Sequence, residues 1–256
     1  MSIIDDWINP YYLEDATAEM IRESMLAKPD IKYAVLDNFF KIDKLEELIR
    51  EHKDLEFSEE KDRVVSGVKL PYDGSVVFAK SGEHYGSELF FDDEWHRYCC
   101  YLANINIKLP ATTEIKLRKH RPYADGFWIH TDSVVKDQKH RGAAAVIIAY
   151  FNKAWKVSHG GLLQMWRVDE ANHEGSLLVN SPNGRMDFLT TQKRICTSSP
   201  GGGFVDKKPH DLVLVDQILP IYNRVFICNF QHSPAYHSIT PSNGRSRTGF
   251  VQWLYE

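Results

Sequence analysis

Ala143-Ala-Ala-Val-Ile-Ile-Ala-Tyr-Phe151 is the longest apolar run in the chain, and its length fits a buried β-strand. Further short segments of strand character lie on both sides of it, with Gly, Pro and Asn between them: Glu114–His120, Gly161–Val168, Leu212–Val215, Arg224–Phe230 and Thr248–Tyr255. Several short strands separated by turn residues are typical of a β-sandwich or β-barrel. The C-terminal half of the chain is therefore expected to form a two-sheet β core.

The N-terminal part has a different pattern, which predicts helices. Glu14–Lys28 places apolar residues mainly at three- and four-residue spacings, as one buried helix face requires. Asp43 followed by Glu46 is typical of a capping box and predicts a helix that begins at Asp43 and ends near His52. Asp92–Asn104 predicts a further helix.

These patterns predict one domain over residues 1–256, of fold class mainly β with N-terminal helices (α+β). Residues 1–110 are expected to be a mostly helical support, and residues 111–256 the core. The polar stretch at about 170–210 is expected to be an insertion with little regular structure, of the kind that can serve as a lid.

Composition excludes some classes of partner. The formal net charge of -4 gives no electrostatic reason to expect nucleic acid or an anionic membrane. The residues after Met1 lack the features of a secretory signal, and no apolar run approaches the roughly 20 residues of a membrane-spanning helix. The four cysteines are expected to be reduced thiols of a cytoplasmic protein, because they form no Cys-x-x-Cys pair. The oligomeric state stays open.

Two short segments carry residues suited to a metal site. Gly126-Phe-Trp-Ile-His130-Thr-Asp132 places a histidine and a carboxylate two residues apart, and so on one face if the segment is a strand. His237 follows more than a hundred residues later, after the apolar segment that ends at Phe230. Two histidines and one carboxylate form the facial triad of non-haem iron(II) oxygenases, which leaves coordination positions open for reactants. Satisfied core histidines are the alternative, but Asp132 would then be buried at a high cost.

A basic residue completes the pattern. Arg247 stands ten residues after His237, at the start of the last apolar strand. A guanidinium fork is the natural partner for a carboxylate held in a dry interior, which predicts a carboxylate-binding role for Arg247. Arg245 has the same strand parity and is the second candidate.

Together these residues resemble the 2-oxoglutarate- and iron(II)-dependent dioxygenases, and most closely their prolyl-4-hydroxylase-like branch. His237-Ser-Ile-Thr-Pro241, with Gly244 and Arg247, is similar to the C-terminal motif of that branch. Gly160-Gly-Leu-Leu-Gln-Met165 is similar to its Gly-Gly strand, and Tyr33–Phe40 to its N-terminal entry. The resemblance covers roughly residues 31–256, with specific identities in three short blocks.

The resemblance implies a double-stranded β-helix (jelly-roll) core that binds Fe(II), with 2-oxoglutarate and O2 as co-substrates and ascorbate as an optional addition. It implies that His130, Asp132 and His237 are the catalytic metal ligands. Arg247 would bind the 2-oxoglutarate carboxylate, with Tyr123 as a weaker candidate for the same co-substrate. Relatives that halogenate replace the carboxylate ligand by a small residue; this chain keeps Asp132, which implies hydroxylation.

The expected substrate is an amino acid, free, carrier-bound or within a peptide, hydroxylated at an unactivated C–H bond while 2-oxoglutarate is decarboxylated to succinate. A free amino acid would need a further charged side chain for its termini, and Arg118, Arg121 and Arg224 are unranked candidates. The alternatives are a protein-residue (prolyl-type) hydroxylase, a non-catalytic jelly roll that binds metal, and a cupin-like metal enzyme. The Tyr123 assignment departs from the family pattern, which often has a tyrosine nine residues before the first ligand, where this chain has Arg121.

Overall fold

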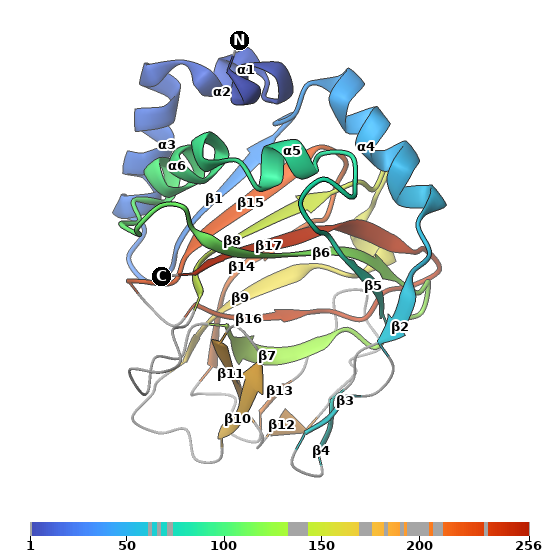
Figure 1. Ribbon diagram of the computed structural model, residues 1–256. Coiled ribbons are helices and arrows are strands. Elements are labelled where there is room, and N and C mark those ends of the chain that lie inside the picture. The colour runs from blue at the N-terminus through green and yellow to red at the C-terminus, as the bar shows by residue number, and fades with distance from the viewer. Residues whose placement is uncertain are drawn as a thin grey trace.

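The computed structural model describes residues 2–60, 63–65, 68–70, 74–132, 143–168, 176–181, 184–189, 192–193, 205–206, 212–232 and 235–255. Figure 1 shows helices on one side of a large sheet and a smaller sheet on its other side. The helices are α1 (Ile3–Trp7), α2 (Pro10–Leu13), α3 (Asp15–Ala27), α4 (Ile42–Asp54), α5 (Ser87–Phe90), α6 (Asp93–Ala103) and the 3-10 turn η1 (Val157–His159). Within these residues, no helix is long and apolar enough to cross a membrane.

The three longer helices confirm the helical prediction, with one correction. Helix α4 has Lys41 as its N-cap, without a capping bond from the side chain, so the capping box predicted at Asp43 is wrong. Asp43 lies inside the first turn instead, where a carboxylate suits the helix dipole. Helix α6 is capped as Asp residues usually cap, since Asp92 accepts a hydrogen bond from the Glu94 amide at 2.7 Å.

The large sheet has seven strands in the order β1-β15-β8-β17-β6-β5-β2, and every neighbouring pair is antiparallel. Its strands are β1 (Lys32–Asp37), β15 (Arg224–Asn229), β8 (Ala143–Tyr150), β17 (Arg247–Tyr255), β6 (Thr112–His120), β5 (Gly74–Phe78) and β2 (Ser58–Glu60). The apolar run Ala143–Phe151 thus supplies a central strand, as its composition predicts. Strands β1, β2 and β5 come from the first 110 residues, which support the core with strands as well as helices.

The smaller sheet has six antiparallel strands in the order β10-β11-β7-β16-β9-β14. They are β10 (Ser176–Ser181), β11 (Gly184–Leu189), β7 (Phe127–Thr131), β16 (Tyr236–Ile239), β9 (Leu163–Val168) and β14 (Leu212–Ile218). Two short two-stranded sheets complete the described elements: β3 (Arg63–Val65) with β4 (Val68–Leu70), and β12 (Gln192–Lys193) with β13 (Val205–Asp206).

The prediction that 170–210 has little regular structure is wrong where the structure describes it. Strands β10 and β11 form a hairpin, and β11 pairs with β7 at Asp187↔Thr131 and Phe188↔His130. The open edge of β7 offers backbone donors and acceptors, which a hairpin can satisfy. Much of the remaining insertion lies outside the described residues, and its lid role stays a prediction.

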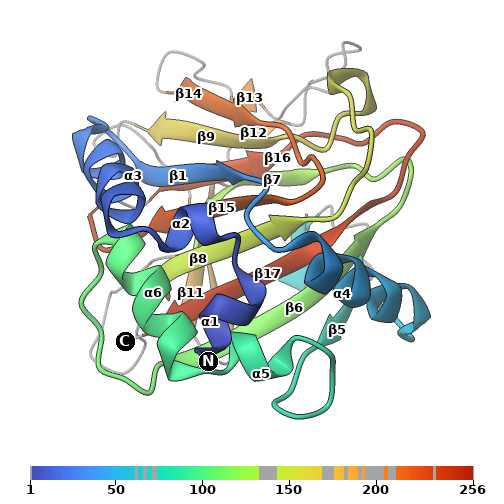
Figure 2. The same ribbon diagram turned by 90° about the horizontal axis from the view of Figure 1, so that it is seen from above.

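The two faces of the large sheet build two separate cores. In β17, Phe250 and Leu254 pack towards the helices, whereas Val251, Trp253 and Tyr255 pack towards the smaller sheet. Figure 2 shows the helices lying across the outer face of the large sheet. Because side chains alternate along a strand, Arg247 has the same parity as Trp253 and belongs to the side that faces the smaller sheet.

Candidate active site

The two predicted ligand segments are neighbouring strands in the smaller sheet. Strand β7 pairs with β16, and the register places His130 opposite His237. Paired residues on antiparallel strands have Cα atoms about 4.5–5.5 Å apart. The side chain of His130 lies outside the described part of the structure, and its backbone position alone is reported. Residues separated by more than a hundred positions in the chain are thus adjacent in the fold.

Asp132 and His237 face each other at the end of this pair of strands. His237 Nε2 lies 3.8 Å from Asp132 Oδ2, and both residues are buried, with 8% and 7% exposed. His237 Nδ1 lies 3.0 Å from the carbonyl oxygen of Ala235. A carbonyl only accepts, so Nδ1 carries a proton in this contact, and in a neutral ring Nε2 would be the nitrogen that presents the lone pair. This is the tautomer that a metal-ligating histidine needs, with its second nitrogen held by a carbonyl.

The donor set of this site fits a divalent cation. An imidazole lone pair and a carboxylate oxygen, both buried and directed at one another, are the nitrogen and oxygen ligands that iron(II) accepts. Among the residues described in full, no three His, Cys, Asp or Glu side chains gather into a metal-binding group. The side chain of His130 is outside that set. Its backbone position, opposite His237, would allow it to be the third ligand.

Neighbouring side chains set the polarity of the site. The ring of Phe230 stacks on His237 with centroids 6.2 Å apart, and Trp253 Nε1 donates a hydrogen bond to Asp132 Oδ2 at 2.8 Å. Burial raises the pKa of the Cys228 thiol, and the Asp132 carboxylate raises it further. Cys228 therefore stays a neutral thiol and is not a candidate thiolate ligand.

Arg247 is buried at the start of β17, next to Gly161 before β9, His120 of β6 and Tyr150 of β8. Its Nη1 donates to the Gly161 carbonyl at 2.8 Å, and its Nη2 lies 3.5 Å from His120 Nε2. Its guanidinium carbon lies 5.8 Å from the centre of the Tyr150 ring. Burial lowers the pKa of His120 well below its usual value, and the Arg247 and Arg118 cations lower it further. His120 is therefore neutral. It neither repels the Arg247 guanidinium nor competes with it for an anion.

Arg245 has a different environment, although sequence parity alone does not separate the two arginines. It is exposed, its Nη1 donates to the Ala154 carbonyl at 3.0 Å, and its guanidinium lies over the Trp155 ring. The structure thus places Arg247 inside the protein and Arg245 on its surface. A dry, low-dielectric position strengthens the interaction of a cation with a carboxylate.

The Gly-Gly block lies against the C-terminal motif. The Gly161 amide donates to the Pro241 carbonyl at 3.0 Å, and a Cβ on Gly160 would lie 2.0 Å from the same oxygen. Both glycines have positive φ, 63° and 64°, which a residue with a side chain rarely adopts. A Cβ on Gly161 would also lie 3.3 Å from Arg247 Cδ. The glycines are needed because the backbone passes close to Pro241 and beside Arg247.

Tyr123 lies on the surface, in the turn between β6 and β7, with 74% of its area exposed. This position does not support its predicted role, which stays a prediction. Tyr150, missed by sequence reasoning, is the buried tyrosine beside Arg247, and burial raises its pKa to about 12. Tyr150 lies at the end of the apolar run Ala143–Phe151, which predicts a strand. Nothing in the sequence indicated that this strand would pair with the one that carries Arg247.

Strand β6 carries charged side chains on the face that Trp253 shares. Lys116 pairs with Glu114 at 3.0 Å, and both side chains are largely buried. The Lys116 ammonium lies 5.3 Å and the Arg118 guanidinium 5.6 Å from the Trp253 ring centre. Lys116 also lies 5.0 Å from the ring of Phe78, which is half exposed and marks the solvent side of this row.

The other arginines considered from the sequence have different surroundings. Arg224 forms a two-pronged pair with Asp37, with Nε and Nη2 donating to its carboxylate at 2.6 and 2.8 Å. Arg121 is exposed in the turn after β6. Arg118, the third candidate, contacts the Trp253 ring, whose indole N–H is bonded to Asp132.

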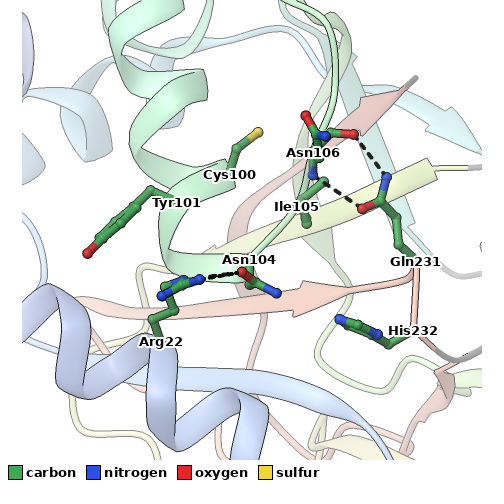
Figure 3. Close-up of a pocket in the computed structure, with 8 residues that line it drawn as sticks. All are labelled: Arg22, Cys100, Tyr101, Asn104, Ile105, Asn106, Gln231 and His232. Atoms are coloured by element: carbon green, nitrogen blue, oxygen red, sulfur yellow. Dashed lines mark hydrogen bonds between the residues drawn. The ribbon is translucent and has the colours of Figure 1, made fainter.

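A separate hollow of about 440 Å³ lies between α3, the end of α6 and the turn after β15. Figure 3 shows two linked pairs in its wall, Arg22 with Asn104 and Asn106 with Gln231. His232 points into this hollow (Figure 3), and none of the predicted metal ligands lines it. His159 is likewise used locally, because its Nδ1 accepts from the Lys156 amide at 2.9 Å.

No protein-family model matches the sequence, and neither does any curated protein. Solved structures do match. A prolyl-4-hydroxylase from Pseudomonas putida is 12% identical with a TM-score of 0.57, over 93% of this chain and 98% of that chain. A prolyl hydroxylase from Trichoplax adhaerens, solved with a hypoxia inducible factor peptide fragment, is 13% identical with a TM-score of 0.56, over 96% and 93%. HygX from Streptomyces hygroscopicus, solved with nickel and 2-oxoglutarate, is 11% identical with a TM-score of 0.56, over 91% and 86%.

The chain therefore has the fold of the 2-oxoglutarate- and iron(II)-dependent oxygenases. The resemblance to the prolyl-4-hydroxylase-like branch, predicted from three short blocks, is confirmed at the level of the fold. At this identity the likeness carries no information about substrate.

Proposed function

We propose that the protein is an iron(II)- and 2-oxoglutarate-dependent dioxygenase that hydroxylates an amino-acid-type substrate. The observation that carries this proposal is the buried His237–Asp132 pair at 3.8 Å, with His130 opposite His237 in the sheet register. The ligand set is His130, Asp132 and His237. The bound iron would activate O2 with electrons from the decarboxylation of 2-oxoglutarate, which yields succinate.

The strand order supports a single jelly-roll domain. Four neighbouring strands of the large sheet, β15-β8-β17-β6, face four of the smaller sheet, β7-β16-β9-β14. Along the chain, β6 to β9 and then β14 to β17 alternate strand by strand between these two sheets, as expected of a double-stranded β-helix. The ligands lie on the smaller sheet and Arg247 on the larger, so the two sheets together enclose the site.

The protein's own groups divide the work of the reaction. His237 presents Nε2 and Asp132 its carboxylate, while the Ala235 carbonyl keeps the imidazole in the ligating tautomer. Arg247 binds the distal carboxylate of 2-oxoglutarate, and its contacts with the Gly161 carbonyl and His120 hold the guanidinium in place. The apolar residues between the sheets keep water away from the reacting groups.

Formation of the co-substrate complex can be tested without knowing the substrate. Under anaerobic conditions, iron(II) followed by 2-oxoglutarate should produce the visible charge-transfer band of the chelated complex, and His237→Ala should remove it. The measurement is the absorption spectrum, with bound iron quantified separately. Wild-type protein that holds iron but gives no band would contradict the use of a 2-oxo acid and favour a cupin-like or non-catalytic role.

The charged row of β6 supports a substrate with a carboxylate and an ammonium group. Arg118 and Lys116 place two cations, and Glu114 one anion, next to the Trp253 that bonds to Asp132. Partly buried cations next to a metal site favour an anionic ligand group. We therefore assign Arg118 to the substrate carboxylate, with a free amino acid as the preferred substrate and a peptide residue as the second candidate.

Arg118→Met is expected to raise the KM of the best free amino acid about tenfold or more, because a charged hydrogen bond contributes roughly 1.5–3 kcal/mol. The KM for 2-oxoglutarate should change little. Substrate-dependent succinate release by a panel of amino acids and their amides measures both values, with exposed Arg121→Met as the control. If amides or internal peptide residues react as well as free acids, recognition of a carboxylate by Arg118 is wrong.

A further inference from the structure

Trp253 links the two sheets at the candidate metal centre. It lies on β17, six residues after Arg247, and 7% of its area is exposed. Its ring packs in the core between the sheets, and its Nε1 donates to Asp132 Oδ2 at 2.8 Å, at the end of β7. One strand of the large sheet therefore holds both the candidate carboxylate-binding arginine and the group bonded to a candidate ligand of the opposite sheet.

The chemistry of this bond suits an ionised carboxylate. An indole N–H can only donate, and an ionised carboxylate can only accept, so the bond favours the charged form of Asp132. The same oxygen that accepts this bond lies 3.8 Å from His237 Nε2, so the indole N–H and the imidazole approach the carboxylate at one oxygen atom.

The indole is itself held in one orientation. The Lys116 ammonium and the Arg118 guanidinium lie 5.3 and 5.6 Å from the ring centre, within the range of cation–π contacts. The ring also packs against the apolar residues between the sheets. An indole N–H that is held by these cation–π contacts and by apolar packing can keep the Asp132 carboxylate in one rotamer before a metal binds.

We propose that Trp253 is a positioning residue of the metal centre, which orients the Asp132 carboxylate through its indole N–H. It acts through Asp132 and does not itself bind the metal, since the indole nitrogen has no free lone pair. This inference rests on the proposed function, in which Asp132 is a metal ligand. Ligand-orienting groups of this kind typically contribute 10–100-fold to metal affinity.

The first test is the affinity of tag-free apo-protein for Ni(II), measured by titration calorimetry. Trp253→Phe, which removes the N–H but keeps an aromatic ring, should weaken binding by about 10–100-fold. Trp95→Phe is the matched control: Trp95 is fully buried and donates its Nε1 to Gln252 Oε1 at 2.9 Å, on the other face of the same strand. Its Ni(II) affinity should equal that of the wild type, although a similar buried hydrogen bond has been removed.

A double substitution separates positioning from general packing. In an Asp132→Ala background, Trp253→Phe should cause no further loss of Ni(II) affinity, because the carboxylate through which it acts is gone. A further loss as large as that in the wild-type background would contradict the proposal and indicate a packing role. Equal Ni(II) binding by wild type and Trp253→Phe would also overturn it.

Wild-type protein labelled with 15N at its indole nitrogens provides a test that needs no change at Trp253. One indole N–H resonance should shift both on adding Zn(II) and on Asp132→Asn substitution. If no indole resonance responds to both, the bond does not couple Trp253 to the metal. If His237→Ala leaves metal binding unchanged, the proposed metal centre fails instead, so the two failures can be told apart.

Discussion

Asp132→Ala is expected to abolish substrate-dependent succinate formation, with a loss of more than about 100-fold, since residues outside the ligand shell already contribute 10–100-fold. The substitution removes the carboxylate 3.8 Å from His237 Nε2 and leaves the buried Trp253 N–H without this acceptor. The loss should appear as weaker metal binding as well as slower turnover. Succinate release at saturating iron(II) and 2-oxoglutarate, together with calorimetric metal binding, measures both effects.

The matched control is Asp37→Ala. Asp37 is a carboxylate at the end of β1 that pairs with Arg224, and its side chain is half exposed. Exposed ion pairs usually contribute about 0–1 kcal/mol, so this variant should keep its activity. Hydroxylation at the wild-type rate by Asp132→Ala would remove this residue from the ligand set, whatever the behaviour of the control.

The two candidate ligand segments can be recognised in the sequence because their signal is local. His130 and Asp132 are two residues apart on a strand, and His237 lies within a motif of its own. What the sequence could not supply was the register that sets His237 opposite His130, because strand pairing across a hundred residues depends on the whole fold. The ligand types of a facial triad, together with the family resemblance, joined the two segments.

Residues that act through tertiary contacts were missed for the same reason. No local pattern marks Trp253 in the sequence, since its bond to Asp132 joins two sheets. Tyr123 was carried over from the family pattern although its distance from His130 departs from that pattern, and it lies on the surface, in a turn. The β10–β11 hairpin was missed because its polar surroundings obscured an alternating pattern that becomes stable only beside β7.

Arg247 and Arg245 show where sequence parity stops being informative. Both have odd numbers and would share a face if the strand began early enough to include them. Strand β17 begins at Arg247, so only this arginine is held by the sheet, opposite His120 of β6. The point at which a strand begins depends on its pairing partners, and this point is what separates the buried guanidinium of Arg247 from the exposed one of Arg245.

Arg247→Ala is therefore expected to raise the KM for 2-oxoglutarate by roughly 30-fold or more, since losing one partner of a buried charge pair costs about 2–5 kcal/mol. Arg245→Ala should change it by less than about twofold, as exposed substitutions usually do. Steady-state succinate release against 2-oxoglutarate concentration measures both, with thermal unfolding of each variant as the folding control. An equal or reversed effect would assign the carboxylate to Arg245.

Arg247→Lys makes the test specific to the guanidinium rather than to positive charge. Lysine keeps the charge but cannot donate at once to the Gly161 carbonyl and to a carboxylate in the planar geometry of arginine. A KM between those of wild type and Arg247→Ala is expected. If lysine restores the wild-type KM, charge alone suffices and the contact with Gly161 does not orient the group. If lysine behaves as alanine does, binding depends on the fork that the Gly-Gly block holds in place, which would explain why both glycines are needed beside it.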